Sequence, residues 1–291
     1  MHSQPAAPGA WPADWLVPDW PVPQNVKAVF TTRAGGVSAA PYDSMNLGDH
    51  VGDAPTQVHA NRALLQRAIG ARPVFLKQVH GSAVLTLDAA SADGQQADAC
   101  VTTQRRLACN IMVADCLPVL LSTEQGDVVA AAHAGWRGLA ASGLDPRGSG
   151  VLDSVYASFS ALAQSGRAQA AIKTIAWLGP CIGPSAFEVG AEVRAALVAT
   201  QPEARRFFVA LAPSGASGER KYLADLAGLA RMRLQALGVS RIYGNDGSAP
   251  WCTVSNPSRF FSHRRDAAIP GNGFGNGFGT TGRMAACIWL D

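Results

Sequence analysis

The sequence predicts an α/β fold, arranged as a single-domain layered sandwich on a mixed sheet. Short apolar runs bounded by Gly, Asp and Pro crowd the middle third of the chain, which is typical of buried strands. Segments with helical spacing of apolar residues flank these runs. Because no linker-like stretch divides the chain, we expect one domain over residues 25–291 behind a proline-rich extension over residues 1–24.

The first elements of the chain follow from local signals. Residues 1–24 should be extended, because their prolines disfavour helix, with the tryptophans packed on the body. A strand is predicted from Val26 to Thr32, and a helix from an N-cap at Asp53 to about Gly70. Five apolar runs then predict strands of one sheet: 74–79, 83–87, 111–113, 117–121 and 128–132.

The second half of the chain is predicted to hold a helix at 151–164, a strand at 172–178, a helix after Ser185, a helix at 223–237 and a strand at 284–290. The spacing from Ser185 to Glu188 fits a capping box, and Gly238 stands where a helix ends. The segment Pro270–Gly279 is too rich in glycine to order without help, so we expect a mobile surface loop.

The composition excludes several classes of protein. With 48% apolar residues the chain can bury a core, and a net charge of +3 without a basic stripe argues against nucleic-acid binding. No run approaches the roughly 20 apolar residues of a membrane span, and no signal peptide is visible. Six irregularly spaced cysteines do not form a disulfide framework. We therefore expect a cytoplasmic protein.

Three residues at the ends of predicted strands are candidate metal ligands. His80 and His133 each end an apolar run, and Cys116 directly precedes one. Side chains at strand ends can leave the core and converge at a sheet edge, and imidazole with thiolate is a donor set of zinc sites. Taken singly, a buried cysteine more often packs as a small apolar residue than binds a metal. A histidine at a strand end caps backbone groups about as often as it binds a metal. Spacing alone leaves metal binding and these structural roles about equal.

Other polar segments are weaker candidates. The glycine-bearing turn around Arg137 would join a strand to a helix, where backbone N–H groups and a guanidinium could receive phosphate, although a surface arginine fits equally well. Thr31–Gly36 and Asn46–Gly48 form a second polar loop region. Phe260–Asp266 could place a cation near a pocket, but its alternation favours a half-exposed strand.

Motifs spread over nearly the whole chain resemble the multicopper polyphenol oxidase family, also called the laccase-domain family, whose members are regarded as zinc-dependent purine nucleoside phosphorylases. The matching stretches are 30–38, 44–48, 50–53, 76–81, 114–118, 133–138, 179–183, 187–190 and 261–266. Two departures stand out: His263 replaces a tyrosine usual in the family, and the glycine-rich insert separates Asp266 from the segment Thr281–Arg283.

The resemblance implies that His80, Cys116 and His133 are the catalytic metal ligands and that the fold is cysteine-hydrolase-like. It implies phosphorolysis of adenosine, inosine and S-methyl-5′-thioadenosine, with some adenosine deaminase activity. The substrates would be purine nucleosides and phosphate. The substrate-binding residues that we expect within these motifs are Arg33, Asn46, Gln78 and Arg137.

Three rival interpretations remain open. A metal-free hydrolase or amidase would use Cys116 as nucleophile and His133 as base, leaving His80 without a role. A structural zinc module would need a fourth ligand, with Cys100 or Cys109 nearest in sequence. A copper-dependent polyphenol oxidase is disfavoured, because a four-copper site needs more than six histidines and paired His-x-His segments. The zinc-deaminase motifs, His-x-Glu and Pro-Cys-x-x-Cys, are also absent.

Overall fold

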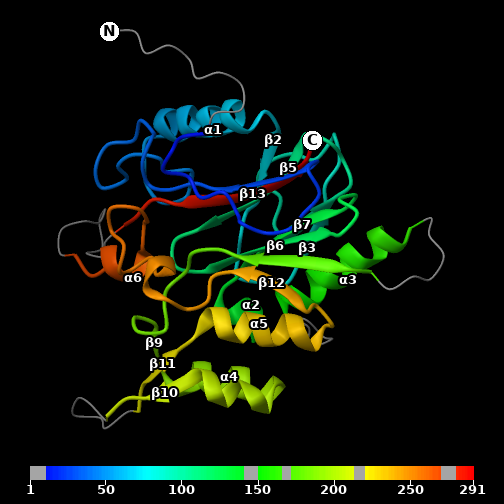
Figure 1. Ribbon diagram of the computed structural model, residues 1–291. Helices are drawn as coiled ribbons and strands as arrows, with labels where there is room; N and C mark the ends of the chain where they lie inside the picture. Colours follow the sequence, from blue (N-terminus) through cyan, green and yellow to red (C-terminus); the bar gives the residue numbers. More distant parts are fainter. Residues whose placement is uncertain (1–10, 141–149, 166–171, 213–219, 270–279) are drawn as a thin grey trace.

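A computed structural model shows four stacked layers: a helix, a four-stranded sheet, a six-stranded sheet and a second set of helices (Figure 1). The structure describes residues 11–140, 150–165, 172–212, 220–269 and 280–291. The predicted α/β class and mixed sheet are confirmed. Among the described residues, no helix is both long and apolar enough to span a membrane.

The four-stranded sheet joins the two ends of the described chain. Its order is β1 (Val26–Phe30), β13 (Met284–Leu290), β5 (Leu107–Val113) and β2 (Arg72–Phe75). β13 pairs antiparallel with both β1 and β5, whereas β2 runs parallel to β5. The sequence prediction for β13 is confirmed in its bounds.

The six-stranded sheet carries most of the middle of the chain. Its order is β12 (Arg241–Gly244), β8 (Thr174–Leu178), β6 (Leu117–Thr123), β7 (Val129–Ala134), β4 (Ala99–Thr102) and β3 (Val84–Thr86). The prediction that the middle runs form one sheet was wrong, since β2 and β5 belong to the other sheet. Both sheets are covered on both faces, so their strands are uniformly apolar and the sequence pattern cannot assign them to different sheets.

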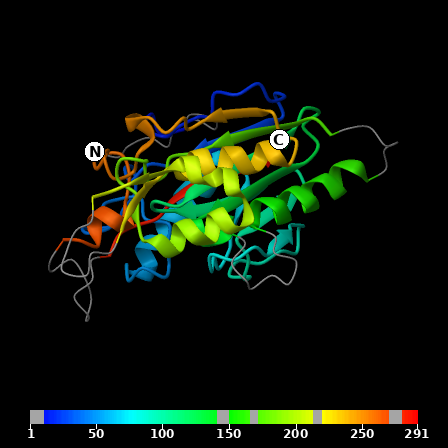
Figure 2. The ribbon, with the colours of Figure 1, turned by 90° about the horizontal axis from the view of Figure 1, so that it is seen from below.

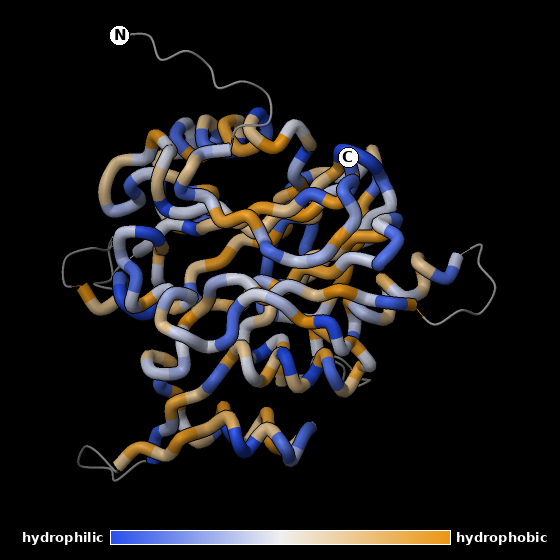
Figure 3. The backbone as a smooth tube through the Cα atoms, viewed as in Figure 1, coloured by the Kyte–Doolittle hydropathy of each residue, from blue (hydrophilic) through white to orange (hydrophobic). Residues whose placement is uncertain are grey.

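Alternating side chains of β7 and β13 build separate cores on the two faces of each sheet. In β13, Met284, Ala286 and Ile288 face the gap between the sheets, and the intervening residues pack towards the outer helix. In β7, Val129 and Ala131 face the same gap, while Ala130 and Ala132 face the lower helices. Apolar residues follow these central strands in Figure 3. His133 continues the series that points into the gap between the sheets.

Helix α1 (Pro55–Ile69) covers the outer face of the four-stranded sheet. It ends at Gly70, whose φ of 66° is left-handed, as the sequence predicts. The predicted N-cap was wrong, because Ala54 is the N-cap. Asp53 accepts hydrogen bonds from Ser38 (2.6 Å) and Asn46 (2.9 Å) instead, so its carboxylate joins two loops.

The helices below the six-stranded sheet are α2 (Trp136–Leu139), α3 (Val151–Gln164), α4 (Ala191–Thr200) and α5 (Leu226–Ala236), and Figure 2 shows this layer from below. The predicted helix at 151–164 is confirmed. The predicted helix at 223–237 begins only at Leu226, because Asp225 caps it by accepting the N–H of Gly228 at 2.8 Å. Gly238 follows it with a φ of 87°.

The helix predicted after Ser185 is α4, which begins only at Ala191, so the predicted capping box from Ser185 to Glu188 was wrong. Residues 183–187 form a turn in which the N–H groups of Ala186 and Phe187 donate to the carbonyl of Gly183. Glu188 then enters β9 (Glu188–Val189) of a small antiparallel sheet with β11 (Tyr222–Ala224) and β10 (Phe208–Ala210). Pairing with β11 therefore takes the place of the capping box.

The N-terminal residues from 11 onwards pack on the four-stranded sheet. Leu16 and Phe30 exchange backbone hydrogen bonds of 2.9 and 2.8 Å, Trp15 is buried, and the rings of Trp11 and Trp289 lie 6.0 Å apart. The expected packing of the N-terminal tryptophans is confirmed for Trp11 and Trp15. The glycine-rich segment 270–279, expected to be a surface loop, lies outside the described residues.

Candidate metal centre

Two imidazoles and a thiol converge where the gap between the two sheets opens. His133 lies within β7, Cys116 directly precedes β6, and His80 lies in the loop after β2. Their potential ligand atoms all lie within 4.8 Å of one another, and the two imidazole rings are 4.7 Å apart. The sequence prediction that these three side chains meet is therefore matched by the fold.

A buried carboxylate, Asp98, orders two members of the cluster. Its Oδ1 lies 2.9 Å from Nδ1 of His133 and also accepts the His80 N–H at 2.8 Å. Its Oδ2 accepts the N–H groups of Val79 and Gly81 at 3.1 and 2.7 Å. Burial alone would raise the pKa of Asp98, but the bonds from His133 and these amides lower it. A carboxylate bound to Nδ1 leaves Nε2 of His133 free for a metal.

The loop that carries His80 fits closely against the turn after β7. His80 has a φ of 61°, a left-handed conformation that the three hydrogen bonds of this loop to Asp98 stabilise. A Cβ on Gly135 would lie 3.0 Å from Sγ of Cys116 and 3.1 Å from Cδ2 of His80. Glycine at position 135 therefore lets the β7–α2 turn approach both side chains.

The electrostatics of the cluster favour a thiolate. Burial raises the pKa of Cys116, but the charge of His133 and hydrogen bonds from His133 and His80 lower it to about 6. Burial lowers the pKa of His133, but the Cys116 thiolate and the bond to Asp98 raise it to about 9. Without a metal, the pair is therefore a thiolate beside an imidazolium at neutral pH.

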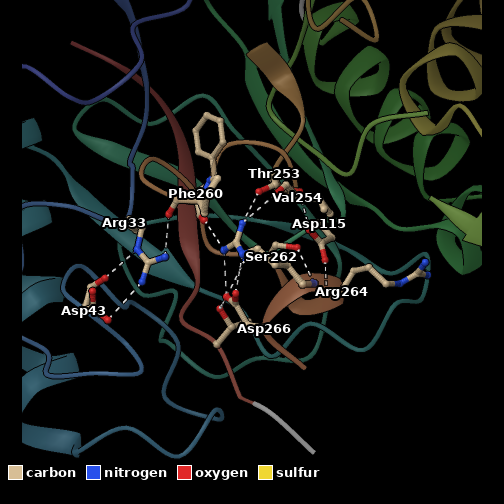
Figure 4. Close-up of polar contacts among 12 residues, drawn as sticks. Arg33, Asp43, Asp115, Thr253, Val254, Phe260, Ser262, Arg264 and Asp266 are labelled. Carbon is tan, nitrogen blue, oxygen red and sulfur yellow. Dashed lines mark hydrogen bonds and ion pairs between the residues drawn. The ribbon is translucent and has the colours of Figure 1, made fainter. Parts of the chain in front are cut away.

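Asp115 positions Cys116 and ties it to α6 (His263–Asp266). It has a φ of 92°, unusual for a residue with a side chain, and its carbonyl accepts the Ile182 N–H at 2.9 Å. Its carboxylate accepts the Thr253 hydroxyl at 2.5 Å and the Arg264 N–H at 2.6 Å, as drawn in Figure 4. These bonds hold the backbone conformation that presents Cys116.

A cavity of about 440 Å³ contains the cluster, a size typical of small-molecule sites. Apolar side chains of β5 and of the helical layer form part of its wall, among them Met112, Val113, Trp136 and Leu226. Its polar and charged lining residues are His50, Gln78, His80, Asp115, Cys116, His133, Arg137, His263, Arg264 and Arg283. Basic groups outnumber the single carboxylate, so the cavity suits an anionic or partly anionic ligand.

Of the four expected substrate-binding residues, the structure places two in this cavity. Gln78 lines it, although its amide is paired with the backbone of Met112 through two bonds of 2.8 Å. Arg137 also lines it, exposed and stacked on Trp136, with its guanidinium carbon 4.4 Å from the ring centre. Its position in the strand-to-helix turn between β7 and α2 is as predicted.

Arg33 and Asn46 do not line the cavity. Arg33 donates to the backbone carbonyls of Asp43 (3.0 Å) and Pro257 (2.9 Å) and pairs with the Asp43 carboxylate, so it ties two loops together (Figure 4). Asn46 is buried and accepts the N–H groups of Gly48 and Arg283, both at 2.9 Å. Both residues therefore serve as scaffold behind the site.

Sequence reasoning missed several residues of the site. Asp98, His50 and Arg283 were not among the predicted site residues, yet His50 and Arg283 line the cavity and Asp98 binds His133. A carboxylate between Ala97 and Ala99, in an apolar run, was the available signal for Asp98. The preference for a strand at Phe260–Asp266 was also wrong: Ser262 caps the short helix α6, which brings His263 and Arg264 to the cavity.

The donor set fits a metal with an open coordination position. Imidazole and thiolate are zinc ligands, with bonds of about 2.0–2.3 Å, and small rotations would bring these three side chains to that range. Within the described parts of the chain no fourth His, Cys, Asp or Glu joins the group. Cys100 and Cys109, candidates for closing a structural site, are buried in the core between the sheets.

Comparisons with known proteins agree along the whole chain. The model of the multi-copper polyphenol oxidoreductase laccase family matches residues 27–291. A purine nucleoside phosphorylase of Pseudomonas aeruginosa is 45% identical over 276 residues, which cover 95% of this chain and 98% of that protein. The purine nucleoside phosphorylase YfiH of Escherichia coli is 44% identical, with coverage of 94% and 98%. A crystal structure of Neisseria meningitidis protein NMB0706 matches with a TM-score of 0.78 at 42% identity, over 96% of this chain and 99% of that one.

Proposed function

Because the chain belongs to the multi-copper polyphenol oxidoreductase laccase family, and relatives above 40% identity are named purine nucleoside phosphorylases, we propose that it is a zinc-dependent purine nucleoside phosphorylase. The nucleosides would be adenosine, inosine and S-methyl-5′-thioadenosine, and adenosine would also be deaminated at C6. The observation that carries the proposal is the convergence of His80, Cys116 and His133 in a cavity of nucleoside size with basic walls. The cytoplasm is the proposed compartment, since all six cysteines are free thiols.

In phosphorolysis, a phosphate oxygen forms a bond to the anomeric carbon as the bond from that carbon to the purine nitrogen breaks. The base leaves with the electron pair and takes up a proton, giving the free base and ribose 1-phosphate, or 5-methylthioribose 1-phosphate. Zinc at His80, Cys116 and His133 would supply a Lewis acid with one open position. The basic side chains would orient phosphate, and the apolar wall would exclude water.

The residues around the cluster would hold these groups ready before substrate arrives. Asp98 fixes the ring of His133 and the backbone on both sides of His80. Asp115 fixes Cys116 relative to α6. Gln78 closes the wall between the β2 loop and β5 through its paired bonds to Met112. Rigid support of this kind reduces the reorganisation needed during the reaction.

The substitution Cys116→Ala tests the proposal. It removes the sulfur ligand, so we expect ribose 1-phosphate formation from inosine to fall by about two orders of magnitude or more, with loss of bound zinc. Cys100→Ala, in the core between the sheets, is the matched control and should retain zinc and activity. Equal rates for Cys116→Ala and the wild type would refute the metal-centred reaction.

One observation favours a second candidate function. Cys116, His133 and Asp98 form a chain in which the thiol has a pKa of about 6 and the imidazole is oriented by a carboxylate, as in a cysteine hydrolase. This alternative needs neither metal nor phosphate and gives His80 no necessary role. The donor set also suits copper, the ion of a polyphenol oxidase. Elemental analysis of the purified protein separates these cases from zinc.

A further inference from the structure

Arg283 and two histidines line the same cavity. Arg283, His50 and His263 all line it, although they come from the C-terminal segment, the loop before α1 and the start of α6. Burial first, and the charge of Arg283 second, lower the pKa of both His50 and His263. Both rings therefore favour their neutral forms.

The backbone and side chain of Arg283 are held in place from several sides. Its N–H donates to Oδ1 of Asn46 at 2.9 Å, and its carbonyl accepts the N–H of Leu47 at 3.1 Å. Nη1 donates to the carbonyls of Thr281 (3.0 Å) and Gly282 (3.2 Å). A Cβ on Gly48 would lie 2.7 Å from Cγ of Arg283, so the stem of the side chain packs directly on that loop.

The guanidinium has no carboxylate partner in the described parts of the chain. Arg33, Arg233, Arg241 and Arg265 each form an ion pair, but no carboxylate of a described residue lies within 4.0 Å of the nitrogens of Arg283. Asp115 contributes to the electrostatic field at Arg283, yet its two carboxylate oxygens already accept bonds from Thr253 and Arg264. Burial lowers the pKa of Arg283. A cation in this setting is stabilised by an anionic ligand.

The other arginines of the cavity are less suited to this task. Arg137 is exposed and lies against the Trp136 ring. Arg264 donates from Nη2 to the carbonyl of Glu188 at 3.0 Å and is exposed as well. Within the described chain, Nε and Nη2 of Arg283 make no hydrogen bond to protein, and this edge of a guanidinium can bind two oxygens of one phosphate.

We propose that Arg283, flanked by His50 and His263, forms the subsite that binds the phosphate co-substrate. This assignment rests on the proposed phosphorolysis and moves the main phosphate contact from Arg137 to Arg283. The guanidinium binds two phosphate oxygens, and each neutral imidazole donates one N–H. His80, Cys116 and His133 line the same cavity as Arg283, so a phosphate bound at Arg283 shares the cavity with the proposed metal ligands.

Steady-state kinetics of the zinc-loaded enzyme with inosine and inorganic phosphate test this assignment. Arg283→Gln should raise the KM for phosphate at least tenfold and leave the KM for inosine within about twofold. Arg283→Lys keeps a positive charge without the planar guanidinium. Its KM for phosphate should lie between those of the wild type and Arg283→Gln. Arg105→Gln, an exposed arginine outside the cavity, is the matched control. If circular dichroism shows that Arg283→Gln does not fold, Arg283→Lys is the variant that tests the assignment. An unchanged KM for phosphate in Arg283→Lys then overturns it.

Product analysis of the wild type and a calorimetric titration with phosphate alone together separate this inference from the proposed function. If the wild type forms ribose 1-phosphate but Arg137→Gln, not Arg283→Gln, raises the KM for phosphate, the subsite is wrong and the phosphorylase stands. If the wild type forms no sugar phosphate, the phosphorylase is wrong. Calorimetry then decides the subsite: phosphate binding that Arg283→Gln weakens tenfold or more supports it, and no binding by the wild type overturns it.

Discussion

At the scale of single residues, the site depends on how its environment changes the chemistry of ordinary side chains. Cys116 is one of six cysteines, and the other five are fully buried. Burial raises the pKa of Cys109, Cys181 and Cys287, whereas the neighbouring histidines lower that of Cys116. The low pKa that distinguishes Cys116 is thus set by His80 and His133, and not by exposure alone.

This difference predicts how alkylation of the metal-free protein depends on pH. Because the pKa of Cys116 is lowered to about 6, its thiolate should already be half formed near that pH, and iodoacetamide labelling should rise between pH 5 and 7. Mass spectrometry can assign the label to Cys116. The substitution His133→Ala removes the main stabilising charge and should move the midpoint upwards. A wild-type midpoint between 8 and 9, the range of an ordinary thiol, would contradict the electrostatic account.

Residue types alone could not reveal all of the site. The convergence of Cys116 and His133 was predictable, because both stand at strand ends. His80, which was expected to end a strand, lies in the loop after β2 and was grouped with them by the family resemblance. Arg283 was not, since it reaches the cavity only through contacts with a loop more than two hundred residues away, at Asn46 and Gly48. Asn46 was expected to bind substrate, but its amide is already paired: Oδ1 accepts the N–H groups of Gly48 and Arg283, and Nδ2 donates to the carbonyl of Gly48 and the carboxylate of Asp53.

At the scale of elements, the turn between β7 and α2 passes close to the proposed metal ligands. His133 is placed by the alternation of β7, and Gly135 lets the turn pass close to Cys116 and His80. The sequence predicted this strand and junction because the apolar run and the glycines are both local signals. It could not predict that β2 and β5 belong to a different sheet from β6, because pairing partners are chosen by tertiary contacts.

A matched pair of glycine substitutions tests the importance of this close approach. A Cβ at Gly135 would stand 3.0 Å from Sγ of Cys116, whereas a Cβ at Gly81 would have no neighbour nearer than 3.5 Å. Neither glycine has a positive φ, so alanine is allowed by the backbone at both. Gly135→Ala should therefore lower zinc affinity by roughly 10-fold to 100-fold, the range for misplaced metal ligands, and Gly81→Ala much less. Competition with a chromogenic chelator measures both, and equal affinities would refute the role of the turn.

At the scale of the whole molecule, the candidate site lies where the two sheets meet the helical layer. β5 and β6 come from different sheets, yet the residues that join them, Ala114–Cys116, line the cavity. Cysteine and histidines therefore reach one point from both sheets while the strands behind them remain buried. The class of fold was predictable from the sequence, whereas the split into two sheets and the path of the C-terminal segment depended on the three-dimensional packing.

The most direct test of the central claim is X-ray absorption at the zinc edge of the purified protein, together with its zinc content. The account predicts about one zinc per chain, bound by one sulfur, two imidazole nitrogens and one light, exchangeable ligand. Absence of a metal, or a second sulfur in the coordination shell, would contradict it.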